Sequence, residues 1–173
     1  MKKKLDDNTL SFFQKSLPLI SSILLLLLSY SSVNIFMLDS VHPDLGFICI
    51  YFWMLHRPDL FGMLSVVVIG LLDMAITSVL PGASLFGYLI FYVIIYNTQK
   101  IFNAKSFVVV WCGFMAISFV AVLFKWLVVS IYYSKFLPLL ILIFGYSVSI
   151  ALYPVVSAIL VFIQNRFIQD EGL

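Results

Sequence analysis

The sequence predicts an all-α integral membrane protein, folded as a six-segment transmembrane helical bundle in which two segments are short. Of its 173 residues, 63% are hydrophobic and only 10% are charged. Its mean hydropathy of +1.12 lies far above the range of soluble domains. The apolar residues also fall into runs separated by short polar turns. Helices of about 20 residues with such turns would use nearly the whole chain, leaving little for a soluble domain.

Six apolar runs are the candidate helices: Leu17–Leu38, Leu45–Leu55, Leu60–Leu80, Ala83–Tyr96, Phe107–Tyr133 and Phe136–Ile163. The first follows a basic start, but it exceeds the roughly 7 to 15 apolar residues of a signal peptide and is predicted to be retained. The second and fourth would rise only about 17 Å and 21 Å, against a hydrocarbon core near 30 Å. Asp39 or Ser40 is expected to cap the second helix, which would then begin near Val41. Pro154 is expected to kink the last helix midway.

The basic residues predict an orientation, because Lys and Arg favour cytoplasmic loops. Six spans with both chain ends in the cytoplasm place most of the basic residues on that side: Lys2, Lys3, Lys4, Lys15, Arg57, Lys100, Lys105 and Arg166. Residues 1–16 are then a cytoplasmic segment, residues 17–163 the transmembrane domain and residues 164–173 a cytoplasmic tail. Tyr51, Phe52 and Trp53 would approach the inner interface, and Tyr132 and Tyr133 the outer one.

Two charged residues stand deep inside apolar runs, Asp73 in the third and Lys125 in the fifth. The helical rise places them about 10 Å and 12 Å below the outer ends of their helices, so they share a level. Each alone would cost at least about 2.5 to 3.5 kcal/mol near the bilayer centre. We therefore predict an Asp73–Lys125 pair, or a shared polar pocket that opens outward. In the alternative, Lys125 extends alone to the outer headgroups and Asp73 bonds a neighbouring helix.

Glycines predict close helix packing in the middle of the chain. Gly62 and Gly70 are eight residues apart, so they would form one flat stripe on the third helix. The stretch "LPGASLFG" contains a Pro-Gly turn at Gly82 and a further small residue at Gly87. The third and fourth helices are therefore expected to form a tight antiparallel pair.

No catalytic constellation, cofactor motif or metal site is predicted. His42 and His56 fall on opposite faces of the membrane in this topology and cannot cooperate. Cys49 and Cys112 lie in apolar runs and are expected to be small buried side chains. The serines of the apolar helices are expected to bond the preceding turn, because none has a base beside it.

The stretch "YFWMLHRPDLFGMLSVVVIGLLDMAITSVLPGASLFGYLIFYVI", residues 51–94, resembles the middle of the bacterial rod shape-determining protein MreD family. The shared features are a short aromatic segment, an inner turn at Arg57 and Pro58, a "GLLD" helix and a glycine-bearing fourth segment. The final "ALYPVVSAILVFIQNRF" is similar to the family's Pro-containing last helix. The likeness covers about the last two thirds of the chain. It departs at "SVLPGASLFGY", where the family commonly has an "S-x-L-G" turn, and Lys125 is not carried over from it.

The resemblance implies a non-enzymatic component of the cell-elongation machinery in the bacterial inner membrane. Its implied partners are MreC, RodA, a penicillin-binding transpeptidase and MreB, besides membrane lipid. It also implies a fold like that of the substrate-binding component of energy-coupling-factor transporters. A vitamin-type transporter subunit is therefore the competing function, with Asp73 and Lys125 in its pocket. A small lipid-modifying enzyme is a third reading, which lacks visible acid–base groups.

Overall fold

The structure is a computed structural model that describes residues 2–30, 43–77, 82–102, 106–135 and 139–167. This part of the chain is all-helical and contains no strand. It holds six helices: α1 (Lys2–Tyr30), α2 (Leu45–His56), α3 (Met63–Thr77), α4 (Ala83–Phe102), α5 (Phe107–Tyr133) and α6 (Leu139–Phe167).

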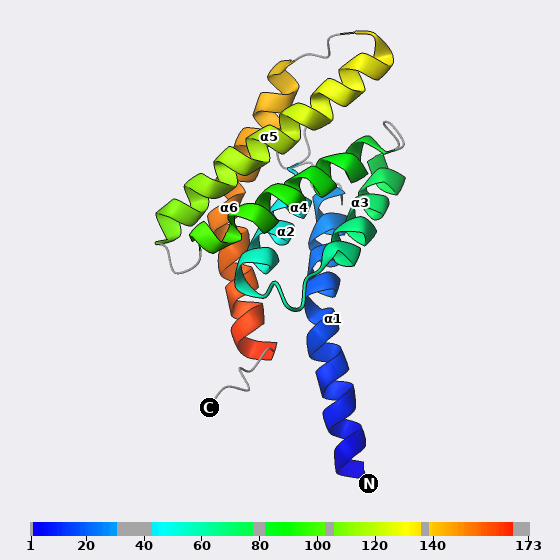
Figure 1. The fold of residues 1–173 in the computed structure, drawn as a ribbon, viewed down its shortest axis with the longest axis vertical. Coiled ribbons are helices and arrows are strands. Elements are labelled where there is room, and N and C mark those ends of the chain that lie inside the picture. Colours follow the sequence, from blue (N-terminus) through cyan, green and yellow to red (C-terminus); the bar gives the residue numbers. More distant parts are fainter. Residues whose placement is uncertain (1, 31–42, 78–81, 103–105, 136–138, 168–173) are drawn as a thin grey trace.

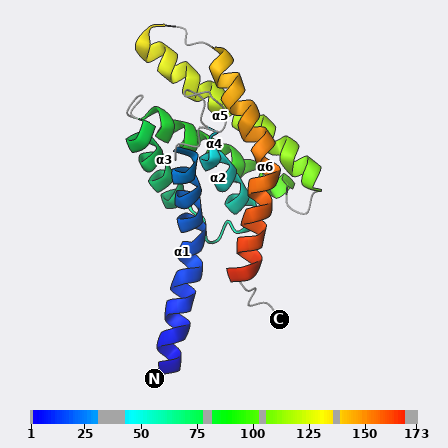
Figure 2. The same cartoon turned by 180° about the vertical axis from the view of Figure 1, so that it is seen from behind.

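The short helix α2 lies at the centre, and the other five helices surround it. Around this ring, α1 packs against α3, α3 against α4, α4 against α5, and α5 against α6. Helices α1, α4, α5 and α6 also contact α2. The first turns of α1 extend beyond the bundle, and α1 begins at the same end of the molecule at which α6 finishes (Figure 1). The reverse view shows α6 crossing the back of α5 (Figure 2).

The helices follow the apolar runs, but several boundaries differ. Helix α1 starts at Lys2, well before its apolar run, α3 starts at Met63 instead of Leu60, and α6 continues past Ile163 to Phe167. Helix α4 continues to Phe102 instead of Tyr96, and its 20 residues rise about 30 Å. Helix α2 begins at Leu45 and not near Val41, because Pro43 and Asp44 are not helical. The expected caps at Asp39 and Ser40 lie outside the described residues.

Helix α2 is the core of the molecule. Every residue from Leu45 to Met54 is buried, including three large aromatic side chains at positions 51–53. Tyr51, Phe52 and Trp53, which were expected to approach the inner interface, are therefore not part of the outer surface of the bundle. Their rings pack inside the ring of helices, where Tyr51 lies edge-on to Phe114 with 5.4 Å between centroids.

The outer surface, by contrast, is strongly apolar. Among the described residues, two segments are long and apolar enough to cross a membrane: α5 at Phe107–Tyr133 and residues Leu142–Arg166 of α6, whose most apolar 18-residue stretches have mean hydropathies of 2.6 and 2.1. Large apolar side chains stand exposed on α1, α3, α4, α5 and α6, up to 82% for Leu64 and 70% for Phe162.

The α3–α4 pair depends on one glycine of the predicted stripe. A Cβ atom at Gly70 would lie 2.8 Å from Leu85 Cδ1 and 3.1 Å from Leu85 Cα, so only glycine allows this approach. Gly62 takes no part, because it precedes α3, is exposed and has no neighbour within 4 Å of an added Cβ. The two-glycine stripe is thus corrected to a single contact. Gly82 has a φ of 97°, which suits glycine in the turn before α4.

Pro154 lies inside α6 and is coupled to α5. A helical proline leaves the carbonyl four residues earlier without its usual donor, here that of Ile150. The indole Nε1 of Trp111 on α5 donates to this oxygen over 3.2 Å. A freed backbone acceptor thereby joins two helices.

Candidate functional site

Five polar side chains from five helical segments meet inside the bundle. They are two carboxylates, one ammonium group and two phenols: Asp44, Asp73, Lys125, Tyr30 and Tyr88. We call them the polar cluster. Tyr30 ends α1, Asp44 precedes α2, Asp73 is in the last part of α3, and Tyr88 is in the first part of α4. A chain that alternates direction from helix to helix brings these positions to one end of the bundle.

Each carboxylate is held by one tyrosine and the shared lysine. The hydroxyl of Tyr30 donates to Asp73 Oδ1 over 2.6 Å, and that of Tyr88 donates to Asp44 Oδ1 over 2.6 Å. Lys125 Nζ lies 3.5 Å from Asp73 Oδ2 and 3.4 Å from Asp44 Oδ2. The ammonium group thus bridges the two acids.

Two glycines lie against this arrangement, and one of them makes room for it. A Cβ at Gly46 would lie 2.5 Å from the Tyr88 hydroxyl oxygen, so a larger residue would displace the phenol that holds Asp44. Gly87 lies against the stem of Lys125, where an added Cβ would be 3.6 Å from the lysine Cβ. The lysine Nζ is also 5.7 Å from the centroid of the Tyr88 ring, within cation–π range.

The members of the polar cluster differ in solvent exposure, from one fully buried acid to a partly exposed edge. Asp73 is fully buried, at 0% exposure, whereas the side chains of Asp44 and Lys125 are 22% and 26% exposed. The segment before α2 is fixed from two sides: the Ser29 hydroxyl donates to the Pro43 carbonyl, and Ser149 Oγ of α6 accepts from the Asp44 backbone N–H over 2.9 Å. Asp44 therefore serves the cluster and makes no side-chain cap on α2.

The formal charges of the cluster do not cancel. Counted as formal charges, two carboxylates and one ammonium group sum to one negative charge, among groups that are mostly withdrawn from water. Removal of charge from water costs free energy unless partners replace the lost hydration. The two tyrosine hydroxyls and the partly exposed edge at Asp44 provide part of that replacement.

The predicted contact between Asp73 and Lys125 is present, and sequence reasoning missed the other three members. Asp44 directly precedes the second apolar run, and this position at the start of a helix is the one signal that could have placed it at the level of the last turns of α3. Tyr30 and Tyr88 carried no signal of their own, because they are two of nine tyrosines. Only the alternating helix directions could have placed them near Asp73.

Several of the other predicted residues lie away from the cluster. Arg57 Nε is 3.6 Å from Asp59 Oδ1 in the turn around Pro58. The ring of His56 stacks on Phe52 at 4.1 Å, and His42 lies outside the described residues. Cys49 is buried as expected, but Cys112 is exposed, which corrects the prediction for that thiol. The hydroxyls of Ser118, Ser147 and Ser149 bond the preceding turn as predicted, for example Ser118 to the Phe114 carbonyl over 2.5 Å, whereas Ser29 donates to Pro43 of another segment.

Within the described residues, no three His, Cys, Asp or Glu side chains gather in a way that could hold a metal ion. Comparisons of the chain with protein-family models, with curated proteins and with solved structures give no match. Function must therefore be argued from the residues and their geometry.

Proposed function

We propose that this chain is a non-enzymatic, multi-pass component of the bacterial inner membrane, with both termini in the cytoplasm. It acts in the cell-elongation machinery, as the resemblance to the MreD family suggests. Its role is that of a scaffold or regulator that contacts MreC, and through the complex RodA, a penicillin-binding transpeptidase and MreB.

One observation carries the membrane part of the proposal: the distribution of polarity is the reverse of that in a soluble protein. Where side chains are described, every charged group belongs either to the polar cluster or to a helix end or turn, as Arg57, Asp59, Lys135 and Arg166 do. The ring of helices turns large apolar side chains outward. An apolar exterior with internal paired charges suits a bilayer.

The scaffold role in this proposal rests on the finding that the polar cluster and Gly70 both join helices within the bundle. Both act within the bundle, fastening α1 to α3 and α3 to α4. The "GLLD" motif thus shapes the fold, which leaves the outward faces of α3, α5 and α6 as the surfaces available for partner helices. Contacts between membrane helices depend on such packing surfaces.

A small-molecule transporter subunit is the second candidate, favoured by the partial exposure of Asp44 and Lys125. Their edge of the cluster would face outward in the proposed orientation, where a polar ligand could reach it.

Copurification separates the two candidates. The tagged chain is extracted from its own cells in a mild detergent, and bound proteins are identified by mass spectrometry, with a multi-pass protein of unrelated function and the same tag as control. Recovery of MreC, RodA or a penicillin-binding protein beyond the control supports the elongation role. Recovery of paired ATPases with a coupling protein would instead establish the transporter reading.

A further inference from the structure

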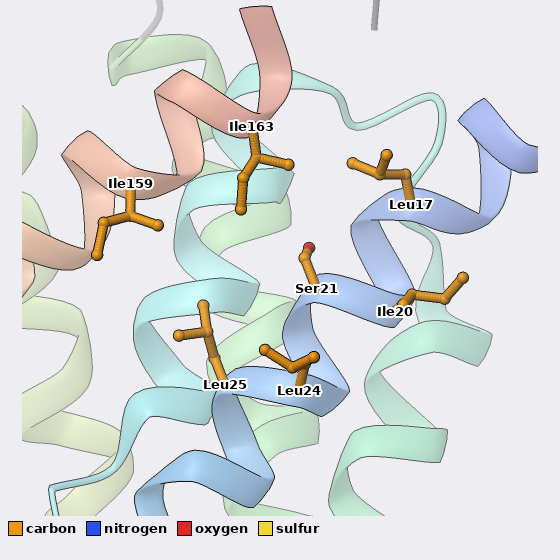
Figure 3. Close-up of a pocket in the computed structure, with 7 residues that line it drawn as sticks. All are labelled: Leu17, Ile20, Ser21, Leu24, Leu25, Ile159 and Ile163. Carbon is orange, nitrogen blue, oxygen red and sulfur yellow. The ribbon is translucent and has the colours of Figure 1, made fainter. Parts of the chain in front are cut away.

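The ring of helices around α2 has a seam between α1 and α6, and a groove of about 220 Å³ lies along it. Figure 3 shows its seven lining residues: Leu17, Ile20, Ser21, Leu24, Leu25, Ile159 and Ile163. In a membrane-inserted bundle, a ligand of this groove comes from the bilayer, so its identity rests on the proposed membrane function.

The residues that line the groove provide almost only apolar contacts for a ligand. Six of the seven side chains are aliphatic. The hydroxyl of Ser21 is already engaged, since it donates to the Pro18 carbonyl over 3.0 Å and accepts from Trp53 Nε1 over 3.1 Å. The occupant of the groove must therefore be apolar along this length.

The volume of the groove decides between a hydrocarbon chain and a helix. Along α1, the lining extends from Leu17 to Leu25, which is about 12 Å at 1.5 Å per residue. A helix about 10 Å in diameter would occupy several times the 220 Å³ of the groove over this length. The groove can therefore enclose a hydrocarbon chain but not a helix.

A basic residue at one end of the groove gives a bound hydrocarbon chain a direction. Ile159, Ile163 and Arg166 are spaced four and three residues apart, so they share one face of α6. Arg166 is exposed and lies about one turn beyond the groove. A ligand with a hydrocarbon tail and a negative headgroup would match both the apolar lining and this cation.

We infer that the α1–α6 groove binds one acyl chain of an anionic membrane phospholipid, with its phosphate near Arg166 and its chain directed toward Leu24. This end of the bundle is the one at which α1 begins and α6 finishes, so the lipid comes from the cytoplasmic leaflet in the proposed orientation. The bound chain closes the seam that the protein leaves open.

Native mass spectrometry of the full chain tests this assignment. The delipidated protein in detergent is titrated with dioleoyl phosphatidylglycerol or dioleoyl phosphatidylcholine. We expect one phosphatidylglycerol per chain to survive activation that strips further lipids. Ile159→Trp and Leu24→Trp fill the groove from its two walls and should each abolish this adduct. Val161→Trp, on the other side of α6, should keep it.

The headgroup is tested separately. Arg166→Gln should lower the preference for phosphatidylglycerol over phosphatidylcholine about five-fold, the effect of one surface cation, and Lys135→Gln should leave it unchanged. Thermal melting of every variant shows that it is folded.

Three results would overturn the assignment: no retained lipid on the wild-type chain, equal loss in the groove and Val161 variants, or a dimer that both groove substitutions abolish. The first two would deny the lipid, and the third would give the groove to a second copy. None depends on elongation partners. Membrane insertion itself is measured by retention after an alkaline wash, so its failure is distinguishable from an empty groove.

Discussion

Lys125 is the residue on which the polar cluster depends most. It is the shared partner of Asp44 and Asp73 and the one cation beside two acids. Loss of an acid moves the cluster toward neutrality, whereas loss of the lysine leaves two carboxylates facing each other. The two kinds of substitution should therefore differ strongly in effect.

We expect Lys125→Met to destabilise the protein by about 3 to 5 kcal/mol, because it leaves buried charge without a partner. Asp73→Asn should cost less than about 1 kcal/mol, because the amide oxygen still accepts from Tyr30 and Lys125 keeps Asp44. Thermal unfolding in detergent measures both, and the double variant should recover part of the loss. Equal losses for the two single variants would show that charge balance does not govern the cluster.

At the scale of helix packing, the glycine positions predict that alanine substitutions lower stability by different amounts. Gly70→Ala should cost about 1 to 3 kcal/mol, since its methyl group would press on the backbone of Leu85. Gly87→Ala should be nearly neutral, because the Lys125 stem lies at an ordinary contact distance. Gly62→Ala is a matched control with open space around it. Melting temperatures that rank the three differently would contradict the packing described for α3 and α4.

The bond from Trp111 to Ile150 predicts a coupling between α5 and α6. Trp111→Phe should cost about 1 to 3 kcal/mol, because it leaves a partly buried carbonyl without a donor. Pro154→Ala returns a helical donor to the same oxygen, so the tryptophan substitution should cost less in that background. A double-mutant cycle on unfolding free energies measures the difference. Simple additivity would mean that the indole serves only as packing volume.

The sequence predicted helices more reliably than it predicted which of their faces are buried. Apolar runs locate α5 to the residue, because charged and turn residues bound them closely. The same runs do not separate the core from the outer surface, since an apolar residue such as Trp53 or Leu64 fits either place. Asp73 and Lys125 could be predicted because charged residues are rare within apolar runs. Tyr30, Tyr88 and Asp44 were missed because their roles arise only when helix ends meet.

At the scale of the whole molecule, the proposed topology predicts the location of each loop. Reporter fusions after residue 135 and at the C-terminus should respond oppositely: alkaline phosphatase active only at the first site, and a fluorescent protein only at the second. The positions of the basic residues favour this orientation. The same compartment for both fusions would contradict an odd number of spans between them.

The enclosure of α2 has a consequence for how such a chain is made. Its 12 residues rise about 18 Å, too little to cross a bilayer unaided. Of its neighbours, α4, α5 and α6 all follow it in the chain. During synthesis, the central helix α2 is therefore made before most of the helices that surround it. Its stable place at the centre depends on helices that the ribosome has yet to translate, so assembly of this bundle can be completed only once the last helix has been made.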